Sequence, residues 1–95
     1  MRRWQTAKIG GLQRNMLCML LRLHAQAPDR EWILWPDLRA LLVERDGTAL
    51  SELSRVRKAL QRRRFLTAEG DKRVRRVRLT PTGTEFALKA IRDNR

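Results

Sequence analysis

Hydrophobic side chains between residues 9 and 23 recur at the spacing of one face of a helix. They are Ile9, Leu12, Met16, Met19, Leu20 and Leu23. Side chains three and four residues apart share a face of an α-helix, so this pattern predicts a first helix over about residues 10–26. The first eight residues are mostly polar and contain one tryptophan, Trp4, and we expect residues 1–8 to form a flexible tail before a folded domain over residues 9–95.

The next two segments predict a short strand and a second helix. Residues 31–35 are aromatic and β-branched, which is typical of a strand, and Pro36 should end it. Pro36 also suits the first position of a helix, because that position needs no amide hydrogen. Leucines follow at helical spacing, and Gly47 is expected to cap the C-terminus of this second helix.

A third helix is predicted over about residues 48–63, with Thr48 or Ser51 as its N-terminal cap. Intervals of three and four residues place its apolar side chains in one narrow stripe. The members of this stripe are Leu50, Leu53, Val56 and Leu60. We expect the stripe to face the core, which leaves the opposite face of the helix exposed.

A hairpin over residues 66–79 should follow the third helix. Phe65–Glu69 predicts one strand, residues 70–72 the turn and Arg73–Leu79 the return strand. Val74 breaks the alternation of the return strand, which either a bulge near Arg75 or exposure of Val74 near the tip would explain.

A last helix is expected after the hairpin. Thr80 suits its N-terminal cap and Pro81 its first position. Thr82 and Glu85 could instead form a capping box two residues later. The complete order of elements is helix, strand, helix, helix, strand, strand, helix, which predicts a single domain of the α+β class.

Positive charge is concentrated in the second half of the chain, which has a formal net charge of +12 over 95 residues. Residues 1–50 hold eight Lys/Arg and five Asp/Glu, a net of +3, whereas residues 51–95 hold fourteen and five, a net of +9. Eleven basic residues lie between Arg55 and Arg78, against only Glu69 and Asp71. A polyanionic partner is the physical reason for tolerating such repulsion, so the charge favours a nucleic acid, an anionic membrane or an acidic protein.

Residues 51–83 carry a series of short motifs in a fixed order. They are Ser51-Glu-Leu-Ser54-Arg55, Phe65-Leu66, Asp71-Lys72-Arg73, Leu79-Thr80 and Gly83. In order and register they resemble the winged helix-turn-helix domain of the MarR-type (multiple antibiotic resistance regulator) transcription repressors, over about a third of the chain. The family usually has glycine where this chain has Arg64. That end of the helix needs a residue in the left-handed conformation.

The resemblance implies a small α+β winged helix-turn-helix domain, α-β-α-α-β-β-α, that binds double-stranded DNA as a transcriptional regulator and needs no cofactor. The third helix would enter the major groove, where Arg55 can pair with guanine and Glu52 can accept from cytosine. These two side chains could instead pair with each other. The basic hairpin, or wing, would lie on the backbone and the minor groove. The candidate DNA-binding residues are Ser51, Glu52, Ser54, Arg55, Lys58 and Arg62 on the helix, and Lys72, Arg73, Arg75, Arg76 and Arg78 on the wing.

Other roles for the same fold stay open. A winged helix can serve as an RNA- or ribosome-associated module or as a protein–protein adaptor. A homodimer through the terminal helices is a further partner that the resemblance implies, although the last helix of this chain is short.

Enzymatic, metal-binding and membrane roles receive little support from the sequence. His24 is the only histidine, and no glycine-rich phosphate loop or His/Cys/carboxylate cluster is present, so no catalytic or metal-binding residue is assigned. Cys18 is expected to be buried as a small hydrophobic residue, and Trp32 and Trp35 to support the core and hairpin. The longest apolar run, residues 16–21, is too short to cross a bilayer. Because no signal-peptide cleavage site follows it, we expect a cytoplasmic protein.

Overall fold

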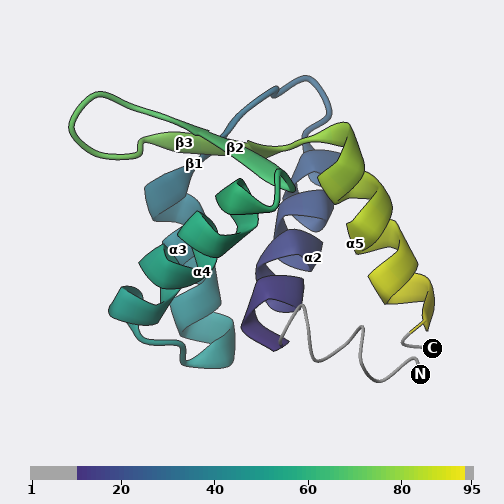
Figure 1. The fold of residues 1–95 in the computed structure, drawn as a ribbon, viewed down its shortest axis with the longest axis horizontal. Coiled ribbons are helices and arrows are strands. Elements are labelled where there is room, and N and C mark those ends of the chain that lie inside the picture. Colours follow the sequence, from purple (N-terminus) through teal and green to yellow (C-terminus); the bar gives the residue numbers. More distant parts are fainter. Residues whose placement is uncertain (1–10, 94–95) are drawn as a thin grey trace.

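Four helices and one antiparallel sheet make up residues 11–93, the part of the chain that this computed structural model describes. The helices are α2 (Gly11–Gln26), α3 (Trp35–Asp46), α4 (Leu50–Arg62) and α5 (Pro81–Asp93), and the strands are β1 (Ile33–Leu34), β2 (Leu66–Glu69) and β3 (Arg76–Leu79). The strand order is β1-β3-β2. Figure 1 shows the sheet on one side of the helices, with the β2–β3 hairpin extending past α3 and α4. The predicted α+β class and order of elements are confirmed, and the predicted tail over residues 1–8 lies outside the described residues.

The core lies where α2 meets the other three helices and the sheet. Its fully buried side chains come from every helix and from β3, because the helical spacings of the sequence direct them inward. They include Met16, Leu17, Leu20, Leu38, Leu42, Leu53, Leu60, Val77 and Ala87. Cys18 was expected in this core but is only half-buried, since it lies on the flank of α2 next to the buried Leu17. Burial still raises the pKa of its thiol, and the charges of Arg14 and Arg22 oppose that rise.

The first strand is shorter than residues 31–35, and the prediction of a five-residue strand is wrong. Only Ile33 and Leu34 pair with β3, opposite Val77 and Arg76. Trp35 is already the first residue of α3, so Pro36 occupies the second helical position rather than the first. The strand ends at Leu34 because the chain turns into the helix at Trp35. The N–H of Trp35 still donates to the carbonyl oxygen of Arg75, at 2.8 Å.

The ends of α3 and α4 test the predicted caps. Gly47 caps α3 in the left-handed conformation, with φ 66°, and its N–H donates to the carbonyl oxygen of Val43, as predicted. Neither Thr48 nor Ser51 caps α4, because the N-terminal cap is Ala49 and no side chain bonds there. Thr48 is buried in the preceding turn instead. Leu50 was expected in the core but is 57% exposed, since it is the first helical residue and burial begins one turn later.

The end of α4 shows why a left-handed residue is needed before the hairpin. The N–H of Phe65 donates to the carbonyl oxygen of Leu60, and the N–H of Arg64 to that of Gln61. This pair of bonds is a Schellman motif, which usually has glycine at the left-handed position. Arg64 occupies that position with φ 63°, so an arginine bears the strain that glycine would avoid.

The hairpin and α5 are joined by a close contact. The oxygen Oγ1 of Thr80 accepts a hydrogen bond from the N–H of Gly83 at 2.9 Å, so Thr80 is the cap and the alternative capping box from Thr82 does not form. A Cβ atom on Gly83 would lie 1.8 Å from the carbonyl oxygen of Phe65. Glycine therefore lets α5 approach the start of β2, where the rings of Phe65 and Phe86 pack 4.8 Å apart.

The return strand begins three residues later than predicted, at Arg76. Before it, the N–H of Arg75 donates to the carbonyl oxygen of Glu69 at 2.8 Å, and Val74 is half-buried against the core. Residues 73–75 therefore leave the strand geometry, which explains why Val74 does not fit the alternation.

Candidate nucleic-acid interface

One face of α4 presents three cations to solvent. Four side chains spaced at intervals of four, three and four residues are exposed: Ser51, Arg55, Lys58 and Arg62. At about 100° per residue these positions fall within about 60° around the helix axis. The buried residues Leu53, Val56 and Leu60 lie on the opposite side. Packing of that apolar stripe against the core therefore orients the basic stripe outward.

Glu52 and Ser54 flank this stripe, and both are partly buried. The carboxylate of Glu52 lies 3.8 Å from the guanidinium of Arg55, whose side chain is 78% exposed. The pairing of these two residues that the sequence allowed is thus present in the protein alone. An exposed pair of this kind contributes about 0.5 kcal/mol or less, so a base or phosphate could displace it.

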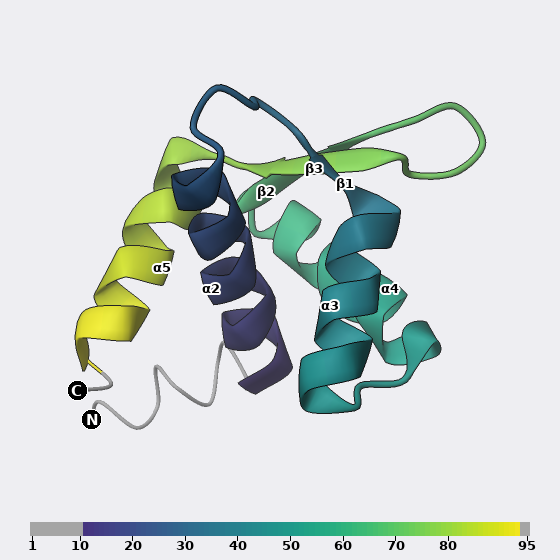
Figure 2. The ribbon, with the colours of Figure 1, turned by 180° about the vertical axis from the view of Figure 1, so that it is seen from behind.

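The connection between β2 and β3 carries three further exposed cations. Lys72, Arg73 and Arg75 are all exposed, as is Asp71 beside them. The free end of the hairpin and the N-terminal end of α4 project from the same end of the molecule in both views (Figures 1 and 2). Two segments that carry exposed cations and lie about twenty residues apart in the sequence therefore project from the same end of the molecule.

Arg76 and Arg78, candidate DNA-binding residues of the wing, both have partners within the protein. Arg76 donates to Glu69 through Nε at 2.7 Å and also through Nη2, and Arg78 lies 2.9 Å from the carboxylate of Glu31. Both guanidinium groups also lie over the ring of Trp32, at 4.5 and 4.6 Å from its centroid. These two arginines therefore connect β3 to β2 and to the segment just before β1, and the carboxylates of Glu69 and Glu31 offset their charge.

Arg57 is a candidate residue that the sequence interpretation missed. Its side chain is buried, with 8% exposure, and its guanidinium lies 5.1 Å from the centroid of the buried Trp35 ring. The signal was present in the spacing, because Leu53, Val56, Arg57 and Leu60 follow the i, i+3, i+4, i+7 pattern of a buried helix face. Burial lowers the pKa of this guanidinium, although an arginine stays charged at neutral pH.

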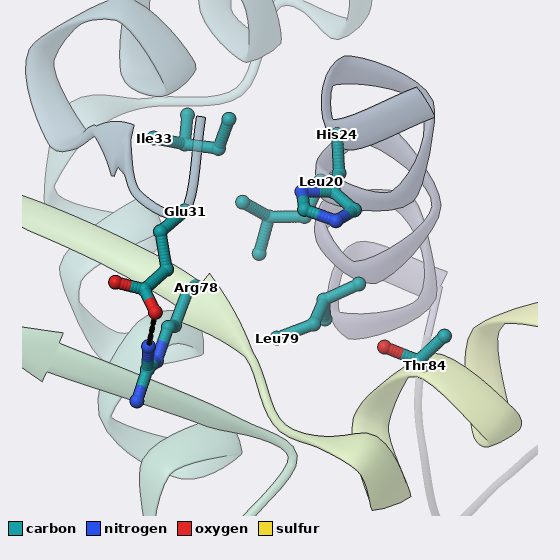
Figure 3. A pocket seen from close by; sticks show the side chains of 7 residues that line it. All are labelled: Leu20, His24, Glu31, Ile33, Arg78, Leu79 and Thr84. Carbon is teal, nitrogen blue, oxygen red and sulfur yellow. Dashed lines mark ion pairs between the residues drawn. The ribbon is translucent and has the colours of Figure 1, made fainter. Parts of the chain in front are cut away.

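A small pocket lies at the other end of the sheet, between α2, β1, β3 and α5 (Figure 3). Its lining residues are Leu20, His24, Glu31, Ile33, Arg78, Leu79 and Thr84. A water-sized molecule can occupy about 50 Å³ of it, whereas a cavity that holds benzene has about 150 Å³. The pocket therefore has room for a few waters. His24 is exposed at its edge.

Two further features of residues 11–93 bear on the class of site. No helix there is long and apolar enough to cross a membrane. Within the same residues, no three His, Cys, Asp or Glu side chains group closely enough to hold a metal ion.

Comparisons with protein-family models, with curated proteins and with solved structures found no match. The geometry of α4 and the hairpin is therefore the basis for a proposed function.

Proposed function

We propose that this protein is a winged helix-turn-helix protein that binds duplex DNA in a sequence-specific manner, as a transcriptional regulator. The observation that carries the proposal is that the N-terminal end of α4 and the free end of the hairpin project from the same end of the molecule (Figure 1), and that both segments carry exposed cations. The order of elements and the three-stranded antiparallel sheet are compatible with this fold. The motifs of residues 51–83 support it further.

In this proposal α4 lies in the major groove, where Arg55 contacts base edges. The side chain of Arg55 is exposed in the second turn of the helix, and a guanidinium can donate two hydrogen bonds to a guanine. Lys58 and Arg62 lie further along the same stripe and contact phosphates, which position the protein without carrying sequence information.

The hairpin lies on the neighbouring backbone and minor groove. Lys72, Arg73 and Arg75 are its exposed cations, and arginine inserted into a narrow minor groove recognises A·T-rich shape. Arg76 and Arg78 contribute less than expected from the sequence, since Glu69 and Glu31 already pair with them.

The division of labour between Arg55 and Arg75 tests this assignment. Binding sites would be selected from a randomised duplex pool, and the affinities for the selected and for random duplexes compared. Arg55→Ala should reduce the ratio of the two affinities, because it removes a base contact worth about 1–3 kcal/mol. Arg75→Ala should weaken both duplexes alike, and Arg92→Ala on the remote α5 serves as the matched control. Equal effects of Arg55→Ala and Arg75→Ala on that ratio would contradict the assignment.

A further inference from the structure

A charged side chain without a counter-ion is buried between α4 and α3. Arg57 is 8% exposed, and among the residues that the structure describes no carboxylate pairs with it. Its one hydrogen bond runs from Nη1 to the side-chain oxygen of Gln61, and its Nε is buried without an acceptor. Buried charges in proteins are normally paired with an opposite charge, so an anionic partner is expected for Arg57.

The position of Arg57 connects α4 with the hairpin through one residue. Its guanidinium lies over the ring of Trp35, at 5.1 Å from the centroid. The backbone N–H of the same tryptophan donates to the carbonyl oxygen of Arg75, in the hairpin, at 2.8 Å. Figure 2 shows this start of α3 directly below β1, close to where the β2–β3 connection leaves the sheet. Arg57 therefore lies at the junction of the two segments that carry the exposed cations.

A duplex bound by both segments must pass its backbone across this junction. The strand of sugar and phosphate that separates a major groove from the adjacent minor groove lies between a helix in the first and a hairpin in the second. The flank of α4 nearest to Arg57 carries Ser54 and Gln61, which are both partly exposed. The side chains next to Arg57 on this flank of the helix are therefore polar and able to form hydrogen bonds.

We propose that Arg57 binds one backbone phosphate of the duplex, the phosphate that lies between the α4 contacts and the hairpin contacts. This rests on the proposed binding of duplex DNA. The ring of Trp35 holds the guanidinium plane in place, and a planar guanidinium offers several N–H donors to a phosphate oxygen, a geometry that suits arginine better than lysine. An apolar side chain of similar volume would often stabilise the fold as well. We therefore attribute the buried charge of Arg57 to ligand binding.

The test compares Arg57→Met with the wild-type protein on one selected duplex. The duplex is synthesised as a series in which a neutral methylphosphonate replaces one phosphate at a time. Wild type should lose roughly tenfold in affinity at the phosphate that Arg57 contacts, the loss of one charge-assisted hydrogen bond. Arg57→Met should bind the unmodified duplex roughly tenfold more weakly and show no further loss at that position. The slope of log affinity against log salt should fall by about 0.9.

Two further variants keep the test decisive. Arg22→Met, on the exposed side of α2, should behave as wild type throughout. If Arg57→Met fails to fold by circular dichroism, Arg57→Lys and Arg57→Gln give the same comparison, with the sensitive phosphate expected to persist in the lysine variant and to disappear in the glutamine variant. A folded Arg57→Met with wild-type affinity, salt slope and phosphate profile would overturn the assignment of Arg57. If wild type binds no duplex at any salt concentration, the proposed function fails instead.

Discussion

The hydroxyl group of Thr80 connects the start of α5 to the end of α4. It donates to the carbonyl oxygen of Arg64 at 2.7 Å, while its oxygen caps α5 through the N–H of Gly83. The side chain of Thr80, sixteen residues after Arg64 in the sequence, therefore links the end of α4 and the beginning of the hairpin to the start of α5.

Thr80→Val should destabilise the domain by about 1–2 kcal/mol, because it removes both the N-terminal cap and the bond to Arg64 while keeping the side-chain volume. The midpoint of urea unfolding measures this loss, and the slope of the transition should stay unchanged. Thr82→Val is the matched control at an exposed position of the same helix. It should change stability by less than about 0.5 kcal/mol, and a loss as large as that of Thr80→Val would contradict the role of the cap.

Arg64→Gly should stabilise the domain by roughly 1 kcal/mol. Arg64 has φ 63°, a conformation that costs a residue with a Cβ atom about 1–2 kcal/mol and glycine almost nothing. Arg64→Ala provides the control, because it removes the same charge and keeps the Cβ atom. Thermal unfolding of both variants distinguishes strain from charge. An equal gain in Ala and Gly would mean that relief of repulsion, and not of backbone strain, is responsible.

Gly83→Ala should destabilise the domain by about 3 kcal/mol, since the added methyl group overpacks a closed contact. Its Cβ atom would lie 1.8 Å from the carbonyl oxygen of Phe65, so α5 must move away from β2. Gly11→Ala meets nothing within 4 Å and should be neutral or stabilising by up to about 1 kcal/mol. Urea unfolding of the Gly83→Ala and Gly11→Ala proteins tests the close contact between Gly83 and Phe65. A Gly83→Ala protein with wild-type stability and unchanged near-UV circular dichroism would contradict it.

Glu69→Gln should strengthen binding to duplex DNA. Glu69 pairs with Arg76 in the free protein, so removal of its charge releases a cation for a phosphate. The slope of log affinity against log salt should then steepen by about 0.9, the contribution of one more neutralised phosphate. Glu85→Gln makes the same change of charge at an exposed position of α5. If it gives the same gain, the effect comes from net charge and not from the release of Arg76.

The sequence predicted those features that depend on local spacing. The burial of Met16 and Leu20 in α2, the cap at Gly47 and the start of α5 at Pro81 follow from helical periodicity and from the conformational preferences of single residues. So does the buried face of α4 from Leu53 onward. In α2 the prediction was wrong at Leu12, which is 37% exposed, and it omitted the buried Leu17. The exposed cations of α4 followed as well, because they lie opposite a regular apolar stripe.

Features that depend on tertiary packing could not be predicted in this way. Arg78 pairs with Glu31 only because β1 lies beside β3, and nothing local to either residue indicates that pairing. Arg57 obeys the spacing of the buried face, but its burial depends on the ring of Trp35 from another helix. Leu50 shows the converse, since it continues the apolar pattern beyond the point where the core ends.

Fluorescence anisotropy against a random-sequence DNA duplex and a length-matched RNA duplex, over a series of salt concentrations, tests the proposed function most directly. The exposed cations of α4 and the hairpin predict a clear preference for DNA. A helix can enter the major groove of duplex DNA, whereas the major groove of an RNA duplex is too narrow for a helix. The log–log slope for DNA should be roughly −4 to −7, from about five to eight neutralised phosphates. Equal or tighter binding to RNA would contradict the proposal in favour of an RNA-associated role, and weak binding to both at low salt would mean that the basic surface serves a protein partner.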